Sequence, residues 1–329
     1  MLTILGPTAS GKTALAVEVA LRIGGEILSA DSRQVFRGMD LGTGKDRDEY
    51  LRPGGRKVEA HLIDIASPGE DYNIYRYQHD FLGAYNEIVT HGHTPILCGG
   101  SGLYAECVLK GYQMDGAPRN EALRARLEAE SSPRLEERLR SYGSRALAAT
   151  PPDLATNRRR TIRAIERADY YSSHPMLEAT AGDEWPHIES LNFCLRLPAA
   201  ERWQRIRTRL EARLKAGLED EVKALIGIPG APKLTEGVST VEPEKLMSYG
   251  LEYKYVTLYV LGRMKRQDMI ENLYIAIRQF AKRQMTWFRG MERRGLKLEW
   301  IDAGDGATPA TMTERIVERW MEWQQQRGS

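Results

Sequence analysis

Cysteine, long apolar segments and an excess of charge of one sign are all scarce in this 329-residue sequence. The three cysteines, Cys98, Cys107 and Cys194, are too few and too scattered to form a disulfide framework or a zinc site. No apolar run reaches the length of a membrane-spanning helix, and no signal-peptide pattern precedes the first apolar strand. The net charge of +2 does not by itself require a nucleic-acid partner. We therefore expect a globular, cytoplasmic protein with reduced thiols.

The most informative segment is the glycine-rich stretch at residues 6–13, which matches the pattern G-x-x-x-x-G-K-[ST]. In such a loop the amide N–H groups wrap a phosphate chain, Lys12 contacts the terminal phosphates, and the Thr13 hydroxyl helps to hold Mg²⁺. An apolar strand precedes the loop and a helical pattern follows it, which disfavours an ordinary glycine-rich turn. We therefore predict that a di- or triphosphate binds to Gly6, Pro7, Thr8, Ala9, Ser10, Gly11, Lys12 and Thr13.

Apolar runs typical of β-strands alternate with helical patterns along most of the chain. The strands are expected at residues 2–5, 27–30, 61–65, 95–98, 193–197 and 297–301. This alternation predicts an α/β protein with a P-loop NTPase-like parallel sheet flanked by helices. Because ligands bind at the carboxyl ends of parallel strands, we expect the 6–13 loop, Asp31 and Ser101 to meet at one edge of the sheet.

Residues 114–187 interrupt the alternation, because they show helical periodicity and several prolines but no strand pattern. Helices are expected there at residues 121–130, 133–147 and 158–171. We therefore predict a helical insertion at 114–187 that divides the core into two parts, residues 1–113 and 188–329. Within the second part, residues 201–294 are expected to be almost entirely helical, with a loop at 228–232.

Two short polar motifs follow predicted strands. Asp31, in the sequence Asp-Ser-Arg-Gln, could bind Mg²⁺ through water or accept a proton from a nucleophile, although a turn or capping role is also open. Arg33 and Gln34 offer planar hydrogen-bonding groups that suit a purine edge. In the second motif, at residues 99–104, glycines permit close approach of a ligand, and Ser101 could cap a helix or touch a phosphate.

Arginine is concentrated in two predicted helices. The first helix carries Arg158, Arg159, Arg160, Arg163 and Arg167, and the second carries Arg202, Arg205, Arg207, Arg209 and Arg213. Arg160, Arg163 and Arg167 share one face of the first helix, a pattern that suits a nucleic-acid phosphate backbone. A solvated charged face is the alternative interpretation.

Six motifs occur in a fixed order. They are G-P-T-A-S-G-K-T at 6–13, D-S-R-Q at 31–34, G-M-D-L-G-T at 38–43, H-L-I-D-I at 61–65, G-G-S-G-L-Y at 99–104 and K-R-Q-M-T-W-F-R at 282–289. Together they resemble the tRNA dimethylallyltransferases, or tRNA isopentenyltransferases, over essentially the whole chain. The resemblance implies transfer of a dimethylallyl group from dimethylallyl diphosphate to N6 of the adenosine 3′ to the tRNA anticodon, with release of diphosphate.

The resemblance also implies roles for single residues. Asp31 matches the catalytic aspartate and would be the base, while Lys12, Ser101 and Arg209 would act on the diphosphate, with Arg205 as a rival to Arg209. Ser101 stands where the family usually has threonine, which keeps the hydroxyl group. Mg²⁺ at Thr13 is the expected cofactor. The helical insertion would clamp the anticodon stem-loop, and tRNA contacts are expected at Asp31, Ser32, Arg33, Gln34, Arg159, Arg160, Thr161, Ile162 and Arg163.

Three other functions are open to a chain with these motifs. They are prenylation of free adenine nucleotides, a small-molecule kinase reaction with ATP, and RNA binding with a vestigial phosphate loop. The arginine-rich insertion argues against the first, and an intact Lys12, Thr13 and Asp31 argue against the last. The segment Gly44-Lys45-Asp46 departs from the Ala-Lys-Pro of many relatives, which bears on tRNA recognition. The lack of heptad or repeat patterns favours a monomer.

Overall fold

The computed structural model describes residues 1–51, 55, 57–112, 117–143, 157–174, 185–304 and 306–328. The chain divides into two compact units. The first unit combines Met1–Gly111 with His187–Ser329, and the second is Tyr112–Pro186. No helix in the described part of the chain is long and apolar enough to cross a membrane.

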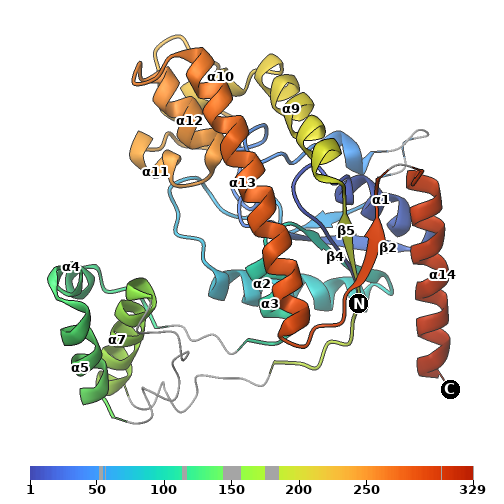
Figure 1. The fold of residues 1–329 in the computed structure, drawn as a ribbon, viewed down its shortest axis with the longest axis horizontal. Coiled ribbons are helices and arrows are strands. Elements are labelled where there is room, and N and C mark those ends of the chain that lie inside the picture. Colours follow the sequence, from blue (N-terminus) through green and yellow to red (C-terminus); the bar gives the residue numbers. More distant parts are fainter. Residues whose placement is uncertain are drawn as a thin grey trace. The chain divides into compact units, whose positions relative to one another are not determined.

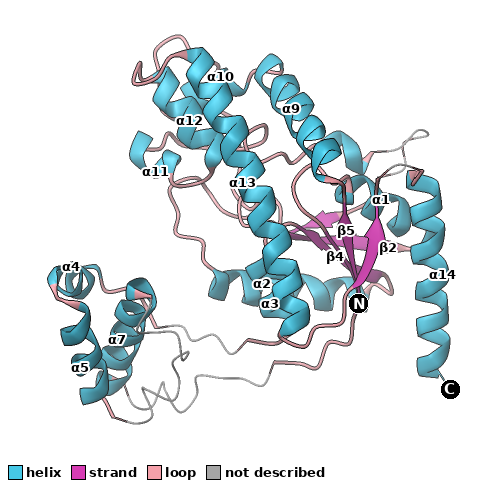
Figure 2. Ribbon diagram, in the orientation of Figure 1, coloured by secondary structure: helices cyan, strands magenta, loops and turns pink. Residues whose placement is uncertain are grey.

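A parallel sheet forms the centre of the first unit (Figure 2). Within the described residues it has six strands in the order β3-β2-β4-β1-β5-β6. Their bounds are Leu2–Leu5 (β1), Gly25–Ala30 (β2), Ala60–His61 (β3), Thr94–Gly99 (β4), Leu191–Arg196 (β5) and Glu299–Asp302 (β6). All neighbouring strands are parallel, so the predicted fold class is confirmed.

Helices cover both faces of the sheet (Figure 1). On one face the sheet packs against α1 (Lys12–Ile23) and α14 (Pro309–Gly328), whose apolar side chains join Leu2, Ile4 and Ile27 in one core. On the other face lie α2 (Ile74–Thr90) and α3 (Gly102–Leu109), which contact β2 and β4. The sheet is therefore covered on both sides, as a fully parallel sheet requires.

One predicted strand is shorter than expected. The apolar run at residues 61–65 continues the strand only to His61, because Leu62 and Asp64 have backbone φ angles of +66° and +58°. This left-handed backbone turns the chain away from the sheet and directs the Asp64 carboxylate to the ammonium group of Lys45 at 2.5 Å. The turn that brings Asp64 to Lys45 therefore ends β3.

A helical layer follows β5 in the first unit. Its helices are α9 (Ala199–Lys215), α10 (Leu218–Leu225), α11 (Pro243–Met247), α12 (Leu251–Val260) and α13 (Arg266–Arg293). Their buried faces form a second core that includes Leu210, Leu218, Val256 and Leu273. The long helix α13 packs against α9, α12 and α3, so it links this layer to the sheet. The predicted helical region is present, but the chain between α10 and α11 is longer than the expected loop at 228–232.

The second unit is built from helices in its described residues. They are α4 (Glu121–Ala129), α5 (Ser132–Ser141) and α7 (Arg158–Ser173). Leucines of α4 and α5 pack against Ile162 and Ile165 of α7. The Glu166 carboxylate is fully buried and pairs with Arg124 at 2.6 Å. The helix predicted at 133–147 ends at Ser141, and residues 144–147 lie outside the described part.

Candidate active site

The carboxyl ends of β1, β2 and β4 meet at one cavity of about 860 Å³. The 6–13 loop follows β1, Asp31 follows β2, and Ser101 follows β4, and all three line this cavity together with residues of α9, α12 and α13. Figure 1 shows that α9 leads away from β5 and that the long α13 runs down past the sheet. The structure thus brings together the residues that the sequence placed at strand ends, as parallel-sheet topology requires.

The loop at residues 6–13 has the backbone that a phosphate-binding turn needs. Gly11 has a φ angle of +80° and caps α1, whose first residue is Lys12. The N-terminus of α1 therefore opens into the cavity with its positive dipole end. Burial lowers the pKa of the Lys12 ammonium group. An anionic ligand beside Lys12 would offset that cost, because opposite charge favours the protonated form.

Two side chains from distant helices hold the loop at Thr8. Gln284 of α13 accepts a hydrogen bond from the Thr8 amide at 2.8 Å and donates one to the Gly100 carbonyl at 2.8 Å. Arg209 of α9 donates a hydrogen bond to the Thr8 hydroxyl. Sequence reasoning missed Gln284 as a site residue. A signal was present, since position 284 lies on the apolar face of the helix, where a glutamine is unexpected.

Hydrogen bonds link Ser101 to the backbone on either side of Asp31. The Asp31 carboxylate accepts a hydrogen bond from the Arg33 amide at 3.0 Å, which is the turn-forming role that the sequence left open. The Ser32 amide donates to the Ser101 hydroxyl at 3.1 Å, and the Ser101 amide donates to the Ala30 carbonyl at 3.0 Å. Ser101 therefore uses its hydroxyl oxygen to hold the Asp31 turn, and it makes no side-chain cap on α3.

Gln34 has a structural role in this fold. Its side chain is buried, its amide oxygen accepts from the Ser29 hydroxyl at 2.9 Å, and its amide nitrogen donates to the Gly44 carbonyl at 2.9 Å. Both ends of the amide are thus hydrogen-bonded within the protein, and Gln34 also lines the cavity. Arg33 lines the cavity and keeps the position that a ligand contact would need.

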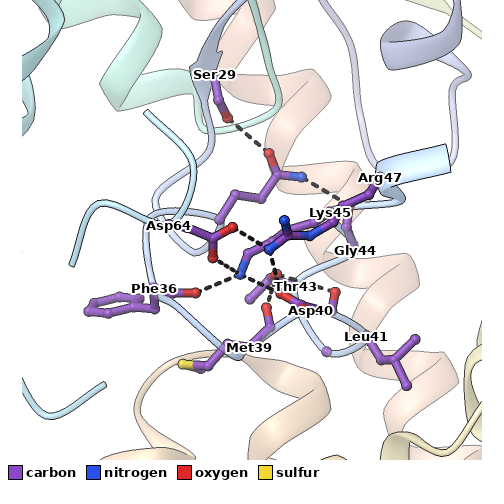
Figure 3. Close-up of polar contacts among 12 residues, drawn as sticks. Ser29, Phe36, Met39, Asp40, Leu41, Thr43, Gly44, Lys45, Arg47 and Asp64 are labelled. Carbon is purple, nitrogen blue, oxygen red and sulfur yellow. Dashed lines mark hydrogen bonds and ion pairs between the residues drawn. The ribbon is translucent and has the colours of Figure 1, made fainter. Parts of the chain in front are cut away.

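A buried lysine stabilises the loop that follows Gln34 (Figure 3). The Lys45 ammonium group donates to the Phe36 carbonyl at 2.6 Å and pairs with Asp40 at 2.7 Å and Asp64 at 2.5 Å. Its side chain is completely buried, and all three of its N–H donors have partners. The pairing therefore satisfies a charge that would otherwise be costly to bury.

The same loop is also held from α10. The Glu221 carboxylate accepts hydrogen bonds from the amides of Asp40, Leu41 and Gly42 at 2.7–3.0 Å and from the Tyr253 hydroxyl at 2.7 Å. A carboxylate that accepts hydrogen bonds from three successive backbone amides holds that backbone more firmly than a neutral acceptor would. Residues 42–44 of this loop line the cavity, so Glu221 and Lys45 shape one of its walls.

The arginines of α9 have different surroundings. Arg209 reaches the 6–13 loop, and burial beside Arg213 lowers its pKa to about 10. Arg205 lines the cavity but pairs with Glu201 at 2.5 Å and is 43% exposed. Arg213 pairs with Asp46 at 3.1 Å and is buried. Of the two candidates for the diphosphate contact, Arg209 is therefore the one that is hydrogen-bonded to the 6–13 loop.

The predicted tRNA contacts on α7 divide into exposed and buried residues. Arg159 and Arg160 are exposed, whereas Thr161 and Ile162 are buried in the helical core of the second unit. Arg163 donates to the Ala117 carbonyl at 2.6 Å. The predicted arginine stripe on α7 is thus partly engaged within its own unit. The exposed arginines, Arg159 and Arg160, lie in the first turn of α7.

The donor set at the loop fits Mg²⁺ only together with a ligand. Thr13 supplies a hydroxyl to the cavity, and Mg²⁺ prefers oxygen ligands and binds substrate phosphates readily. The Ser10 hydroxyl of the same loop is buried without a hydrogen-bond partner. In the described part of the chain, no group of three or more His, Cys, Asp or Glu side chains could hold a metal ion. Phosphate oxygens would have to complete the coordination.

The fold and this cavity define a P-loop-like α/β protein with a helical unit inserted between β4 and β5. A family model described as "IPP transferase" matches residues 34–291, and one described as "Isopentenyl transferase" matches residues 1–58. The chain belongs to the IPP transferase family.

Named relatives cover most of the chain. A tRNA dimethylallyltransferase 1 of Porphyromonas gingivalis is 50% identical over 305 residues, which are 92% of this chain and 94% of the relative. A tRNA dimethylallyltransferase 2 of Bacteroides fragilis is 48% identical over 303 residues, which are 92% of each chain. The crystal structure of a tRNA isopentenylpyrophosphate transferase from Bacillus halodurans has a TM-score of 0.65 and 28% identity, covering 99% of this chain and 97% of that one.

Proposed function

We propose that this protein transfers a dimethylallyl group from dimethylallyl diphosphate to N6 of the adenosine 3′ to the tRNA anticodon, and that diphosphate is the leaving group. One observation carries the proposal: a carboxylate, Asp31, and a phosphate-loop lysine, Lys12, line the same cavity. A prenyl transfer to an amine needs a base and a diphosphate site next to each other. The named relatives support the choice of substrates.

The 6–13 loop would bind the diphosphate. As the C1–O bond of the substrate breaks, its electron pair passes to the diphosphate and negative charge grows there. Lys12 and Arg209 would stabilise that charge, which is the interaction that lowers the barrier rather than merely tightening substrate binding. Thr13 would hold Mg²⁺, which when bound supplies further positive charge at the phosphate oxygens.

Asp31 would act as the base. The exocyclic N6 of adenine is a poor nucleophile, because its lone pair is delocalised into the ring. The bond from N6 to C1 therefore forms as a proton leaves N6, and the Asp31 carboxylate would take that proton. The hydrogen bond from the Arg33 amide holds one oxygen of the carboxylate, and the Ser101–Ser32 contact holds the backbone that carries it.

The acceptor base would have to leave the anticodon loop to reach the cavity. Extrusion of a base from its stack is how enzymes that act on bases gain access to them. The exposed Arg159 and Arg160 supply charge for a tRNA backbone, and Arg33 lies at the cavity. We further propose that the second unit clamps the anticodon stem-loop, and that the enzyme acts as a cytoplasmic monomer.

A transfer assay with three acceptors tests the proposal. Purified protein, Mg²⁺ and labelled dimethylallyl diphosphate are incubated with an anticodon stem-loop that has adenosine after the anticodon, the same loop with guanosine there, or free AMP. We expect label only in the first acceptor. Label in AMP would instead indicate prenylation of free nucleotides. ATP consumption without prenyl transfer would indicate a kinase.

A further inference from the structure

Gln284 is a buried polar residue in the middle of an apolar helix face. Its side chain lies on α13 among the buried residues Ala281, Met285 and Phe288, and it is 7% exposed. Burying an amide is unfavourable unless it is hydrogen-bonded. Here the oxygen accepts from the Thr8 amide at 2.8 Å and the nitrogen donates to the Gly100 carbonyl at 2.8 Å. The amide is thus placed for these two partners.

The two partners belong to the two turns that build the site. Thr8 lies in the loop after β1, and Gly100 directly precedes Ser101 in the turn after β4. A Cβ atom at position 100 would lie 2.7 Å from the Gln284 amide nitrogen, so only glycine permits this approach without a shift. From Gly100 the hydrogen bonds continue through Ser101 to the backbone next to Asp31. Gln284 therefore connects the diphosphate loop to the turn that carries the carboxylate.

We infer that Gln284 is a positioning residue that sets the spacing between the diphosphate loop and the Ser101–Asp31 turn. It acts through the backbone of Thr8 and Gly100. This role rests on the proposed function, in which the leaving group binds at one turn and the base stands on the other. A loop already fixed in its bound conformation loses less entropy when the diphosphate binds.

The test uses substitutions that remove the hydrogen bonds but keep the size of the side chain. Gln284→Met retains the length and loses both bonds. Gln284→Glu keeps the shape and an acceptor for the Thr8 amide, but its carboxylate has no donor for the Gly100 carbonyl. The control is Gln279→Met, because Gln279 lies on the exposed face of the same helix. Circular dichroism and thermal unfolding check that each variant is folded.

Two measurements separate positioning from packing. One is the pair of KM values, for dimethylallyl diphosphate and for the anticodon stem-loop. The other is the affinity for inorganic diphosphate with Mg²⁺, measured by calorimetry. For Gln284→Met we expect the KM for dimethylallyl diphosphate to rise and diphosphate affinity to fall, each by about tenfold, as the loss of two hydrogen bonds predicts. Gln284→Glu loses only the bond to the Gly100 carbonyl, so both values should change in the same direction by a smaller factor. The KM for the stem-loop should not change in any variant. Gln279→Met should keep the wild-type values of both KM values and of the diphosphate affinity.

The inference is overturned if the KM for dimethylallyl diphosphate and the diphosphate affinity stay at the wild-type values. It is also overturned if both KM values rise together, because a general packing defect would affect both substrates. The calorimetric arm does not depend on turnover. If the wild-type protein transfers no prenyl group but Gln284→Met still weakens diphosphate binding, Gln284 orders the diphosphate loop and it is the proposed function that fails.

Discussion

Arg213 lies directly against Gly44, so closely that a Cβ atom at position 44 would overlap its guanidinium group. The same guanidinium pairs with Asp46 at 3.1 Å. Gly44 provides the space for Arg213, and Asp46 neutralises its charge. Arg213 therefore accounts for both Gly44 and Asp46. A proline at position 46 would remove the carboxylate.

The first prediction concerns this contact. Gly44→Ala should lower the free energy of unfolding by about 2–4 kcal/mol, because alanine is strained at the φ angle of +67° and must also displace Arg213. Gly24→Ala is a matched control, since Gly24 has a φ angle of +64° with open space around it. Denaturant titration measures both. Equal losses would show that Arg213 adjusts without cost.

The second prediction concerns the buried ammonium group of Lys45. Lys45→Met should destabilise the protein by about 1–3 kcal/mol, because the buried Phe36 carbonyl loses its charged donor. The carboxylates of Asp40 and Asp64 lose their buried partner but keep the exposed Arg47. Lys57→Met is the control, since the Lys57 side chain is 57% exposed and pairs with Glu59 at the surface. Unfolding curves of similar midpoint for the two variants would contradict the importance of this network.

The third prediction separates the two arginine candidates. Arg209→Ala should reduce kcat/KM for dimethylallyl diphosphate by roughly 10–100-fold, because a charge-assisted hydrogen bond to the loop is lost. Arg205→Ala should reduce it by less than about threefold, since Arg205 is 43% exposed and already paired with Glu201. Steady-state kinetics with both variants test this. A larger loss in Arg205→Ala would reverse the assignment.

The fourth prediction concerns the alkaline pH dependence. Burial lowers the pKa of Lys12 below its ordinary value of 10.5, so the free enzyme loses this proton at a lower pH than an exposed lysine would. Only the protonated form attracts diphosphate. The kcat/KM for dimethylallyl diphosphate should therefore fall on the alkaline side, beginning below pH 10.5.

Arginine at position 12 would stay protonated over this range. The alkaline fall in the Lys12→Arg variant should therefore move to higher pH, where Arg209, whose pKa burial lowers to about 10, still titrates. A fall at the same pH in both proteins would assign the titration to another group.

Much of the fold follows from local sequence. The strand at 2–5, the loop at 6–13 and α1 could be predicted because a short apolar run, a glycine pattern and a helical period lie next to each other. The end of β3 could not, because it depends on the contact between Asp64 and Lys45. An apolar pattern indicates where a strand can form, and a tertiary contact decided where this one ends.

The site shows the same division. Asp31 and Ser101 could be predicted because the carboxyl ends of parallel strands meet by topology. Gln284 could not, since its partners Thr8 and Gly100 are 276 and 184 residues away. Gln34 lines the cavity as its position predicts, but its hydrogen bonds to the Ser29 hydroxyl and the Gly44 carbonyl could not be predicted. The residues at the strand ends thus indicate where the cavity lies. The hydrogen-bond partner of each side chain depends on tertiary packing.

The most direct test of the proposed mechanism is a single-turnover measurement on Asp31→Asn with the adenosine-containing stem-loop and saturating dimethylallyl diphosphate. Asparagine can still accept the hydrogen bond from the Arg33 amide, so the turn should stay intact. The base is lost, and the rate of transfer should fall by about 10²–10⁴-fold while diphosphate affinity is unchanged. A transfer rate within a few-fold of wild type would contradict the assignment of Asp31 as the base.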